Sequence, residues 1–445
     1  MKRKFMVLCA VIFFLALGMQ TDIQPAYAAE NTTIAGEDAT AVEQTYSVTV
    51  IFKSNKGKGS MSSQVVTSNT TIKLKANKFK RTGYTFTGWN TKSNGKGISY
   101  ANKADASSLA TPNNNGKTIT LYAQWKIAPP AIKKATSPTP SHIKVTYGKN
   151  TAASGYVLQY STSKKFTVSK TKTRYVKKNT TSAKLLDVVP NKKYYVRMRS
   201  YRGSNPADGT KCSDWSKTLS VKVKNGKTIM NTKCYKAIEA DVKLTGSGTG
   251  YHAKLVIGNN ISAVSYGIQY DKYAVSPYAG KAVTLIENIS TNNSGGQSYV
   301  RPSGKALKKN KTYHLMITVD KKGKGGVYLD YKKIGSFYQP GLANNPYWNY
   351  ARLEASGRLN GDKVDATFSN ICFKVSNDKE VRYLHNFMTY DEVTFGSNSH
   401  VNAGLKRKIS KADGTVRMYG TMKGVNGDWD SDYDNVSQYA VFNWP

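Results

Sequence analysis

The chain has 445 residues, which is long enough for about three domains of ordinary size. Its 66 Lys and Arg residues outnumber 27 Asp and Glu residues, giving a formal charge of +39 at pH 7, and 30 Tyr residues argue against a largely disordered chain. The basic excess favours a polyanionic partner, either nucleic acid or an anionic cell-wall polymer. It is densest towards the N-terminus: residues 46–126 hold 13 basic and 1 acidic residue, and residues 127–223 hold 20 and 3.

The N-terminus helps to choose between these partners. Lys2-Arg3-Lys4, the apolar stretch Phe5–Leu17 and Ala26-Tyr27-Ala28 have the layout of a secretory signal peptide. We therefore expect residues 1–28 to be removed and residues 29–45 to form a flexible leader. No later stretch has the ~18 apolar residues of a membrane span, so we expect no transmembrane segment in the mature chain. Export predicts a secreted, extracellular or cell-wall-associated protein and argues against nucleic acid as the partner.

Three cysteines remain in the mature chain: Cys212, Cys234 and Cys372. An odd number excludes a complete disulfide framework. Cys234 and Cys372 lie in strand-like segments, so they either pair, if their strands are neighbours, or stay as free thiols. No Cys or His spacing is typical of zinc.

Residues 46–126 contain two aromatic motifs, GYTFTGWN at 83–90 and LYAQW at 121–125. Together they resemble the Listeria–Bacteroides repeat, also called the internalin B-repeat. The resemblance implies a small β-grasp-like spacer of secreted or surface-associated bacterial proteins. We expect large aromatic and aliphatic side chains to form its core, namely Phe86, Trp89, Leu121 and Trp125. Gly83 and Gly88 are expected where a strand turns or approaches another backbone.

The Pro-rich stretch Lys126–Pro140 is predicted to be a linker into the next domain. Residues 127–223 resemble a fibronectin type III domain, through GYVLQY at 155–160 and LDVVPNKKYYVRMR at 186–199. The resemblance implies a spacer or adhesion module. It makes Tyr194 the corner tyrosine, whose hydroxyl bonds to the backbone upstream. Alternate residues of the same strand are expected to face the core.

Residues 224–445 show short strand patterns broken by Gly and Asn. Within Lys311–Phe337, apolar residues stand at alternate positions from 313 to 319, namely Tyr313, Leu315, Ile317 and Val319, which predicts a strand with one packed face. With the stretch VYLDYKKI that follows, this resembles concanavalin A-like (laminin G-like) jelly rolls. The core of the domain is expected at about 229–376; the extension 377–445 belongs either to the same sandwich or to a small appended subdomain. The fold class predicted for the whole chain is all-β: a β-grasp-like repeat module, a fibronectin type III sandwich and a concanavalin A-like jelly-roll sandwich.

Catalysis is not expected. Hydrolases of the jelly-roll type carry paired carboxylates on one strand, and the nearest match here is Glu239 with Asp241, which lacks the second Glu. We interpret these two residues as the solvent-facing side of a strand, and no other catalytic motif is present.

Two loops are candidate binding sites. Aromatic faces stack on sugar rings while amides bond to their hydroxyl groups, which makes a lectin-type site of Tyr347, Trp348 and Tyr350 with Gln339 nearby. The other reading of these aromatic residues is a buried core beneath a loop. Alternating carboxylates suit calcium, and they occur at Asp428, Asp430, Asp432 and Asp434. The alternative is an acidic loop that offsets nearby Lys and Arg; calcium is the one cofactor suggested by the sequence.

The sequence therefore predicts a non-catalytic secreted or surface protein of a Gram-positive-type bacterium. Two basic β spacers would present a lectin-like domain that binds a glycan or a host or cell-surface ligand, and the spacers would hold an anionic cell-wall polymer by charge. The alternatives are an extracellular carbohydrate-active enzyme on the jelly roll and a purely structural cell-wall protein.

Overall fold

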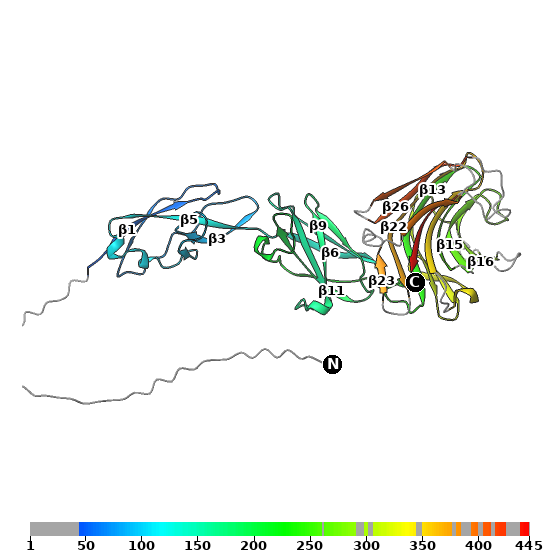
Figure 1. Ribbon diagram of the computed structural model, residues 1–445, viewed down its shortest axis with the longest axis horizontal. Coiled ribbons are helices and arrows are strands. Elements are labelled where there is room, and N and C mark those ends of the chain that lie inside the picture. The colour runs from blue at the N-terminus through cyan, green and yellow to red at the C-terminus, as the bar shows by residue number, and fades with distance from the viewer. Residues whose placement is uncertain are drawn as a thin grey trace, which may run out of the picture.

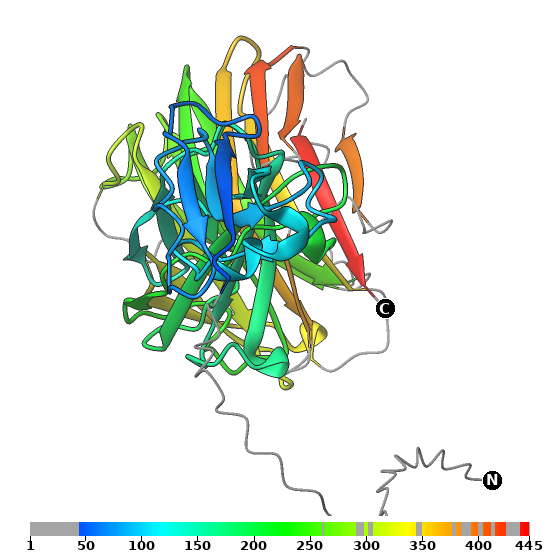
Figure 2. The same cartoon turned by 90° about the vertical axis from the view of Figure 1, so that its left-hand side faces the viewer.

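The computed structural model describes residues 44–259, 262–290, 298–300, 306–343, 349–375, 380–383, 393–398, 404–410, 414–423 and 437–444. They form β-sheets joined by turns and short 3-10 segments, which confirms the all-β fold class. Three bodies follow one another along the molecule (Figure 1), and they overlap when viewed end-on (Figure 2). We call them the repeat module, the middle sandwich and the C-terminal sandwich.

The repeat module is one five-stranded sheet of order β2-β1-β5-β3-β4, in which β1 and β5 run parallel. Its elements are β1 (Ser47–Lys53), β2 (Gln64–Thr67), β3 (Tyr84–Asn90), β4 (Ser99–Tyr100), η1 (Ser107–Leu109), η2 (Pro112–Asn114) and β5 (Thr118–Ile127). Trp89 is fully buried and packs against Phe52 and Phe86, with ring centroids 4.8 and 4.9 Å away. Leu121 is also buried, and Phe86 and Trp125 pack partly buried against this core, as expected. Aromatic rings thus supply the core of a small sheet.

The middle sandwich packs a sheet of order β10-β7-β6 against one of order β12-β11-β8-β9. Its elements are β6 (Ile132–Thr139), β7 (His142–Tyr147), β8 (Gly155–Ser161), η3 (Val168–Lys170), β9 (Thr171–Lys177), β10 (Ser182–Leu185), β11 (Lys193–Tyr201), η4 (Gly209–Lys211) and β12 (Leu219–Lys222). The Tyr194 hydroxyl accepts a hydrogen bond from the Val189 backbone N–H at 3.0 Å. This is the bond to the upstream backbone that was expected of a corner tyrosine. Tyr194, Val196 and Met198 are buried.

The predicted linker is mostly strand. β5 continues to Ile127 and β6 begins at Ile132, so 128–131 alone connect the two bodies. Asn150 of the middle sandwich closes this junction, because its Nδ2 donates to the Gly83 carbonyl at 3.0 Å and to the Ala128 carbonyl at 2.8 Å. Gly83 has a φ of 78°, and a Cβ there would lie 2.5 Å from Asn150 Oδ1. This glycine is therefore required both by its backbone conformation and by the closeness of the next domain.

The C-terminal sandwich stacks two large antiparallel sheets. One has the order β20-β19-β18-β13-β22-β26-β25, with β23 paired to β22, and the other β17-β16-β15-β14-β21-β27-β24. The elements up to η5 are β13 (Lys236–Ser247), β14 (Gly250–Asn259), β15 (Ser262–Asp271), β16 (Lys281–Ser290), β17 (Ser298–Val300), β18 (Thr312–Val319), β19 (Lys324–Leu329), β20 (Lys332–Tyr338) and η5 (Pro340–Leu342). The remaining elements are β21 (Asn349–Gly357), β22 (Lys363–Val375), β23 (Glu380–Tyr383), β24 (Val393–Asn398), β25 (Leu405–Ser410), β26 (Thr415–Thr421) and β27 (Ser437–Trp444).

The extension 377–445 supplies strands to both sheets, which decides the question left open by the sequence: these strands belong to the same sandwich. The stretch Lys311–Phe337 forms β18 and β19 and runs into β20, and Tyr313, Leu315 and Ile317 enter the core as predicted. His314 is buried as well, because the outer face of this sheet lies against the middle sandwich.

Candidate functional site

Two of the four residues of the predicted lectin-type loop, Tyr350 and Gln339, lie in the part of the chain that the structure describes. Tyr347 and Trp348 lie outside the described residues. Tyr350 lies on β21 opposite Gly258 of β14, and its ring fills the space of the missing side chain, since a Cβ there would lie 2.3 Å from Tyr350 Cζ. Burial raises the pKa of the Tyr350 hydroxyl. Gln339, just before η5, is 9% exposed, and Tyr350 is partly buried.

The predicted calcium ligands lie outside the described residues: Asp428, Asp430, Asp432 and Asp434. Within the part of the chain that the structure describes, no three His, Cys, Asp or Glu side chains cluster in a way that could hold a metal ion. Cys212, Cys234 and Cys372 are buried free thiols, so the alternative of a Cys234–Cys372 disulfide is not realised.

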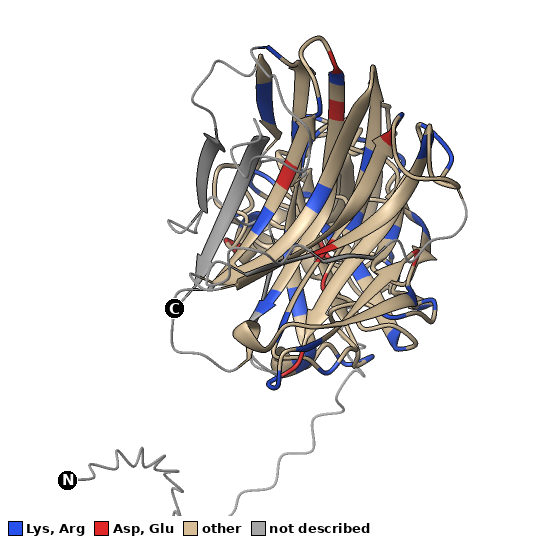
Figure 3. Ribbon diagram, turned by 90° about the vertical axis from the view of Figure 1, so that its right-hand side faces the viewer, with Lys and Arg blue, Asp and Glu red and all other residues tan. Residues whose placement is uncertain are grey.

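Charged side chains project from the outer face of the sheet that contains β14, β15, β16 and β21. On β14, Tyr251, Ala253 and the following alternate residues point into the core, so His252 and Lys254 point outward. Arg352 and Glu354 occupy the matching positions of β21. Basic and acidic positions are visible along these strands in Figure 3. This face lies on the side of the sandwich away from the other two bodies (Figure 1).

Lys254 and Glu287 form an ion pair across an intervening strand. Lys254 Nζ lies 2.8 and 2.7 Å from the two carboxylate oxygens of Glu287 on β16. The Lys254 stem crosses β15 at Gly267, where a Cβ would lie 2.6 Å from Lys254 Cγ. Ser265 Oγ also donates to Glu287 at 2.5 Å. Burial raises the pKa of Glu287, but Lys254 and Ser265 outweigh burial and hold the pKa below its ordinary value.

Glu354 forms the second centre of this face and lies opposite Lys254 in the β14–β21 register. Its carboxylate is 2.9 Å from Arg352 Nη2 and 3.4 Å from His252 Nε2. Burial opposes its charge, yet Arg352 and His252 hold the pKa of Glu354 well below its ordinary range. Burial and the nearby Lys254 lower the pKa of His252, which is therefore neutral near pH 7. On the outer face of this sheet, each carboxylate is thus held in place by a basic side chain, Glu287 by Lys254 and Glu354 by Arg352.

Exposure differs among these side chains. The side chains of Glu287, Glu354 and Arg352 are 12, 16 and 22% exposed, whereas those of His252 and Lys254 are only 3 and 7% exposed. A ligand on this face would meet the two carboxylates and the guanidinium. Sequence reasoning missed this cluster. One signal was present: in strands that are otherwise mostly apolar, charged residues occupy outward-facing positions, between the residues that face the core.

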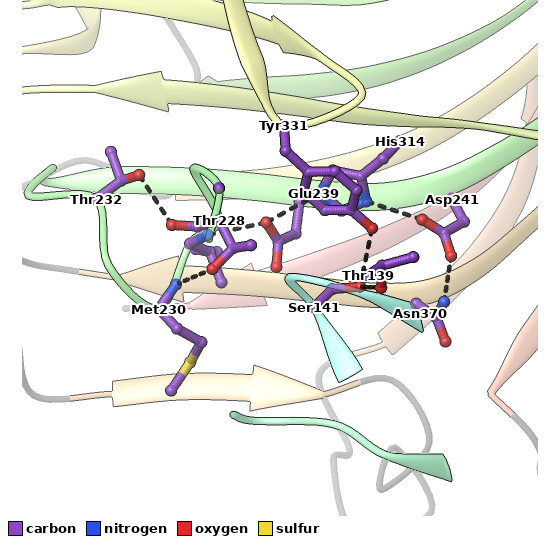
Figure 4. A network of polar contacts seen from close by, with 12 residues as sticks. Thr139, Ser141, Thr228, Met230, Thr232, Glu239, Asp241, His314, Tyr331 and Asn370 are labelled. Atoms are coloured by element: carbon purple, nitrogen blue, oxygen red, sulfur yellow. Dashed lines mark hydrogen bonds and ion pairs between the residues drawn. The ribbon is translucent and has the colours of Figure 1, made fainter. Parts of the chain in front are cut away.

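A second polar network lies on the opposite sheet, where it meets the middle sandwich (Figure 4). His314 Nδ1 is 2.8 Å from Asp241 Oδ1, and His314 Nε2 is 3.3 Å from Glu239 Oε2. The prediction that Glu239 and Asp241 face solvent is wrong: their side chains are 3 and 16% exposed, because the middle sandwich covers this face. Burial opposes the charge of His314, but the hydrogen bonds to Asp241 and Glu239 raise its pKa to about 9.

The network reaches across the domain junction. Tyr331, in the turn between β19 and β20, stacks on the His314 ring with centroids 4.1 Å apart, and its hydroxyl lies 3.0 Å from Ser141 Oγ of the middle sandwich. Asn370 donates to Asp241 and accepts a hydrogen bond from Lys184 Nζ at 3.3 Å. An apolar cluster flanks these contacts, formed by Leu186, Ile229, Cys234, Ala237, Met316, Tyr328 and Cys372. We interpret this network as a structural clamp between the two sandwiches.

Comparisons with known proteins support one part of the chain. Residues 49–124 match the family model of the Listeria-Bacteroides repeat domain, which confirms the repeat predicted there. No curated protein matches the chain. In the described part, no helix is long and apolar enough to cross a membrane.

Three solved structures give weak overlaps. A scytalido-glutamic peptidase with a transition-state analogue inhibitor has a TM-score of 0.26 at 11% identity, covering 42% of this chain and 94% of its own. A glycoside hydrolase family protein from Mycobacterium thermorestibile has a TM-score of 0.22 at 8% identity, covering 56% of this chain and 76% of its own. The FN1–FN3 domains of chicken CNTN1 have a TM-score of 0.18 at 10% identity, covering 52% of this chain and 93% of their own. Similarities at this level carry no argument about activity.

Proposed function

We propose that this chain is a secreted, non-catalytic bacterial surface protein whose C-terminal sandwich binds a glycan on the outer face of β14, β15, β16 and β21. The repeat module and the middle sandwich act as a stiff spacer, because both junctions are closed by hydrogen bonds between neighbouring bodies. The observation that carries the proposal is the row of oriented charges around Glu287, Glu354 and Arg352.

The chemistry of this face suits a hydroxylated ligand. Carboxylates accept hydrogen bonds from sugar hydroxyls, and a guanidinium donates to their oxygens. Because each charge is already held by a partner, the groups keep their orientation before a ligand arrives, which lowers the entropy cost of binding.

Binding is favoured over hydrolysis by the ionisation of the two carboxylates. A glycosidase needs one carboxyl group whose pKa is raised, so that it can act as a general acid. Glu287 and Glu354 both have lowered pKa values, since Lys254 and Arg352 with His252 stabilise their charged forms. Neither residue is set up to donate a proton near pH 7.

A glycan array probed with residues 29–445 tests the proposal. We expect binding to a restricted set of glycans, a loss of about tenfold or more in Arg352→Gln, and unchanged binding in Arg417→Gln, whose guanidinium pairs with Asp365 on the opposite sheet. Thermal melts confirm that both variants are folded. Absence of any glycan ligand contradicts the proposal, and release of new reducing ends from a polysaccharide would replace it with the enzyme alternative.

A further inference from the structure

A cavity of about 380 Å³ opens on the flank of the middle sandwich. Its walls come from β9 and β10, which are edge strands of the two different sheets, and from Asn370 of the C-terminal sandwich. The volume lies within the range of ~300–1,000 Å³ typical of small-ligand sites. Three cations line the cavity, Arg174, Lys177 and Lys184, and none of its lining residues is acidic.

Arg174 is the informative group in this wall. Burial lowers the pKa of its guanidinium, and within the described residues it makes no hydrogen bond or ion pair. The carboxylate that acts on it from a distance, Asp187, already pairs with Lys172 at 2.6 Å and accepts a hydrogen bond from the Tyr160 hydroxyl at 3.1 Å. A guanidinium has five N–H donors in a planar fork, so the partly buried Arg174 offers donors that no group of the described residues takes up.

The surroundings extend the positive field outward. Lys177 and Lys184 are exposed lining residues, Lys184 also donates to Asn370 Oδ1 at 3.3 Å, and Ser182 adds a hydroxyl group. An anion in the cavity would meet the Arg174 fork inside and two ammonium groups outside. Arginine binds phosphate through paired hydrogen bonds, and flanking lysines add charge attraction.

We propose that this cavity binds the phosphate groups of an anionic polymer, a chain of polyols joined by phosphodiesters, next to the junction of the two sandwiches. The site is separate from the glycan face, so either can fail without the other. The cavity volume exceeds what one ion needs, which favours a polymer segment over free phosphate.

The test is calorimetric titration of residues 29–445 with poly(glycerol phosphate), inorganic phosphate and polygalacturonate at low and physiological salt. The variant Arg174→Gln/Lys177→Gln removes two cavity charges. The control Lys217→Gln/Lys222→Gln removes two exposed charges at and before β12, the opposite edge of the same sheet. We expect poly(glycerol phosphate) to bind most tightly, the cavity variant to lose at least tenfold, and the control to stay within twofold at physiological salt.

Several results would overturn the proposal: no binding by the unaltered chain, equal losses in both double variants, or equal affinity for polygalacturonate. The single variant Lys177→Glu, at an exposed position, keeps the test decisive if the double variant unfolds, and it must also weaken binding. Arg352→Gln must bind the polymer normally, and the cavity variant must bind glycans normally.

Discussion

Replacing His314 with Gln tests the clamp between the two sandwiches through its pH dependence. The folded-state pKa of His314 is about 9, raised from an ordinary value of 6.5. The charged form therefore stabilises the folded chain fully below pH 6.5, and this stabilisation is lost as the pH rises through 9. The difference corresponds to about 3 kcal/mol, at ~1.4 kcal/mol per pH unit.

We expect His314→Gln to lower the free energy of unfolding by about 3 kcal/mol at pH 6 and by much less at pH 9.5, because wild-type His314 is then neutral too. Gln keeps a hydrogen-bond donor of similar reach but never carries the charge. Urea unfolding read by pulsed hydrogen–deuterium exchange of the β18 peptide measures the effect locally. Groups that titrate alike in the wild type and in His314→Gln contribute equally to both free energies of unfolding, so they cancel when one is subtracted from the other.

His142 provides the matched control at the same junction. Burial and Lys184 lower the pKa of His142 to about 4, so in the folded chain His142 is neutral between pH 6 and pH 9.5. His142→Gln should change stability by the same amount at pH 7 and pH 9.5. If His314→Gln were equally destabilising at pH 6 and pH 9.5, the charged clamp would be refuted.

Three further predictions concern the other parts of the chain. Gly83→Ala should open the first junction and increase proteolysis at 128–131, whereas Gly116→Ala, which has a similar φ and no neighbour within 4 Å, should not. Trp89→Ala should destabilise the repeat module by about 3–5 kcal/mol in thermal unfolding, and a smaller loss would contradict its central place in that core. Glu287→Gln should cost about 3 kcal/mol because it removes the charged partner that lies 2.7 Å from the buried Lys254 ammonium, whereas Arg417→Gln, at an exposed pair, should cost less than about 1 kcal/mol. Equal losses in urea unfolding would show that burial does not strengthen the Lys254–Glu287 pair.

Much of the fold could be predicted because it is encoded locally. The spacing of aromatic residues around Trp89 and the alternation that begins at Tyr313 each report which face of a strand is packed. Such patterns concern neighbours in sequence, so a single chain displays them directly.

The candidate sites could not be predicted in the same way. Lys254, Glu287 and Glu354 lie on three separate strands, and only the register of β14, β15, β16 and β21 brings them together. The junction is similar: Ser141 and Tyr331 are far apart in the chain, and no periodicity links them. Glu239 and Asp241 were expected in solvent because alternation in one strand does not show that another domain covers its second face.

The claim that the outer face of β14, β15, β16 and β21 binds glycan is tested most directly by a hydrogen–deuterium exchange footprint. Residues 29–445 are compared with and without a glycan selected on the array. We predict added protection in peptides spanning 252–256 and 350–356, and none around Asp365 and Arg417 on the opposite sheet. Protection confined to the opposite sheet, or none on either sheet at saturating glycan, would contradict the account.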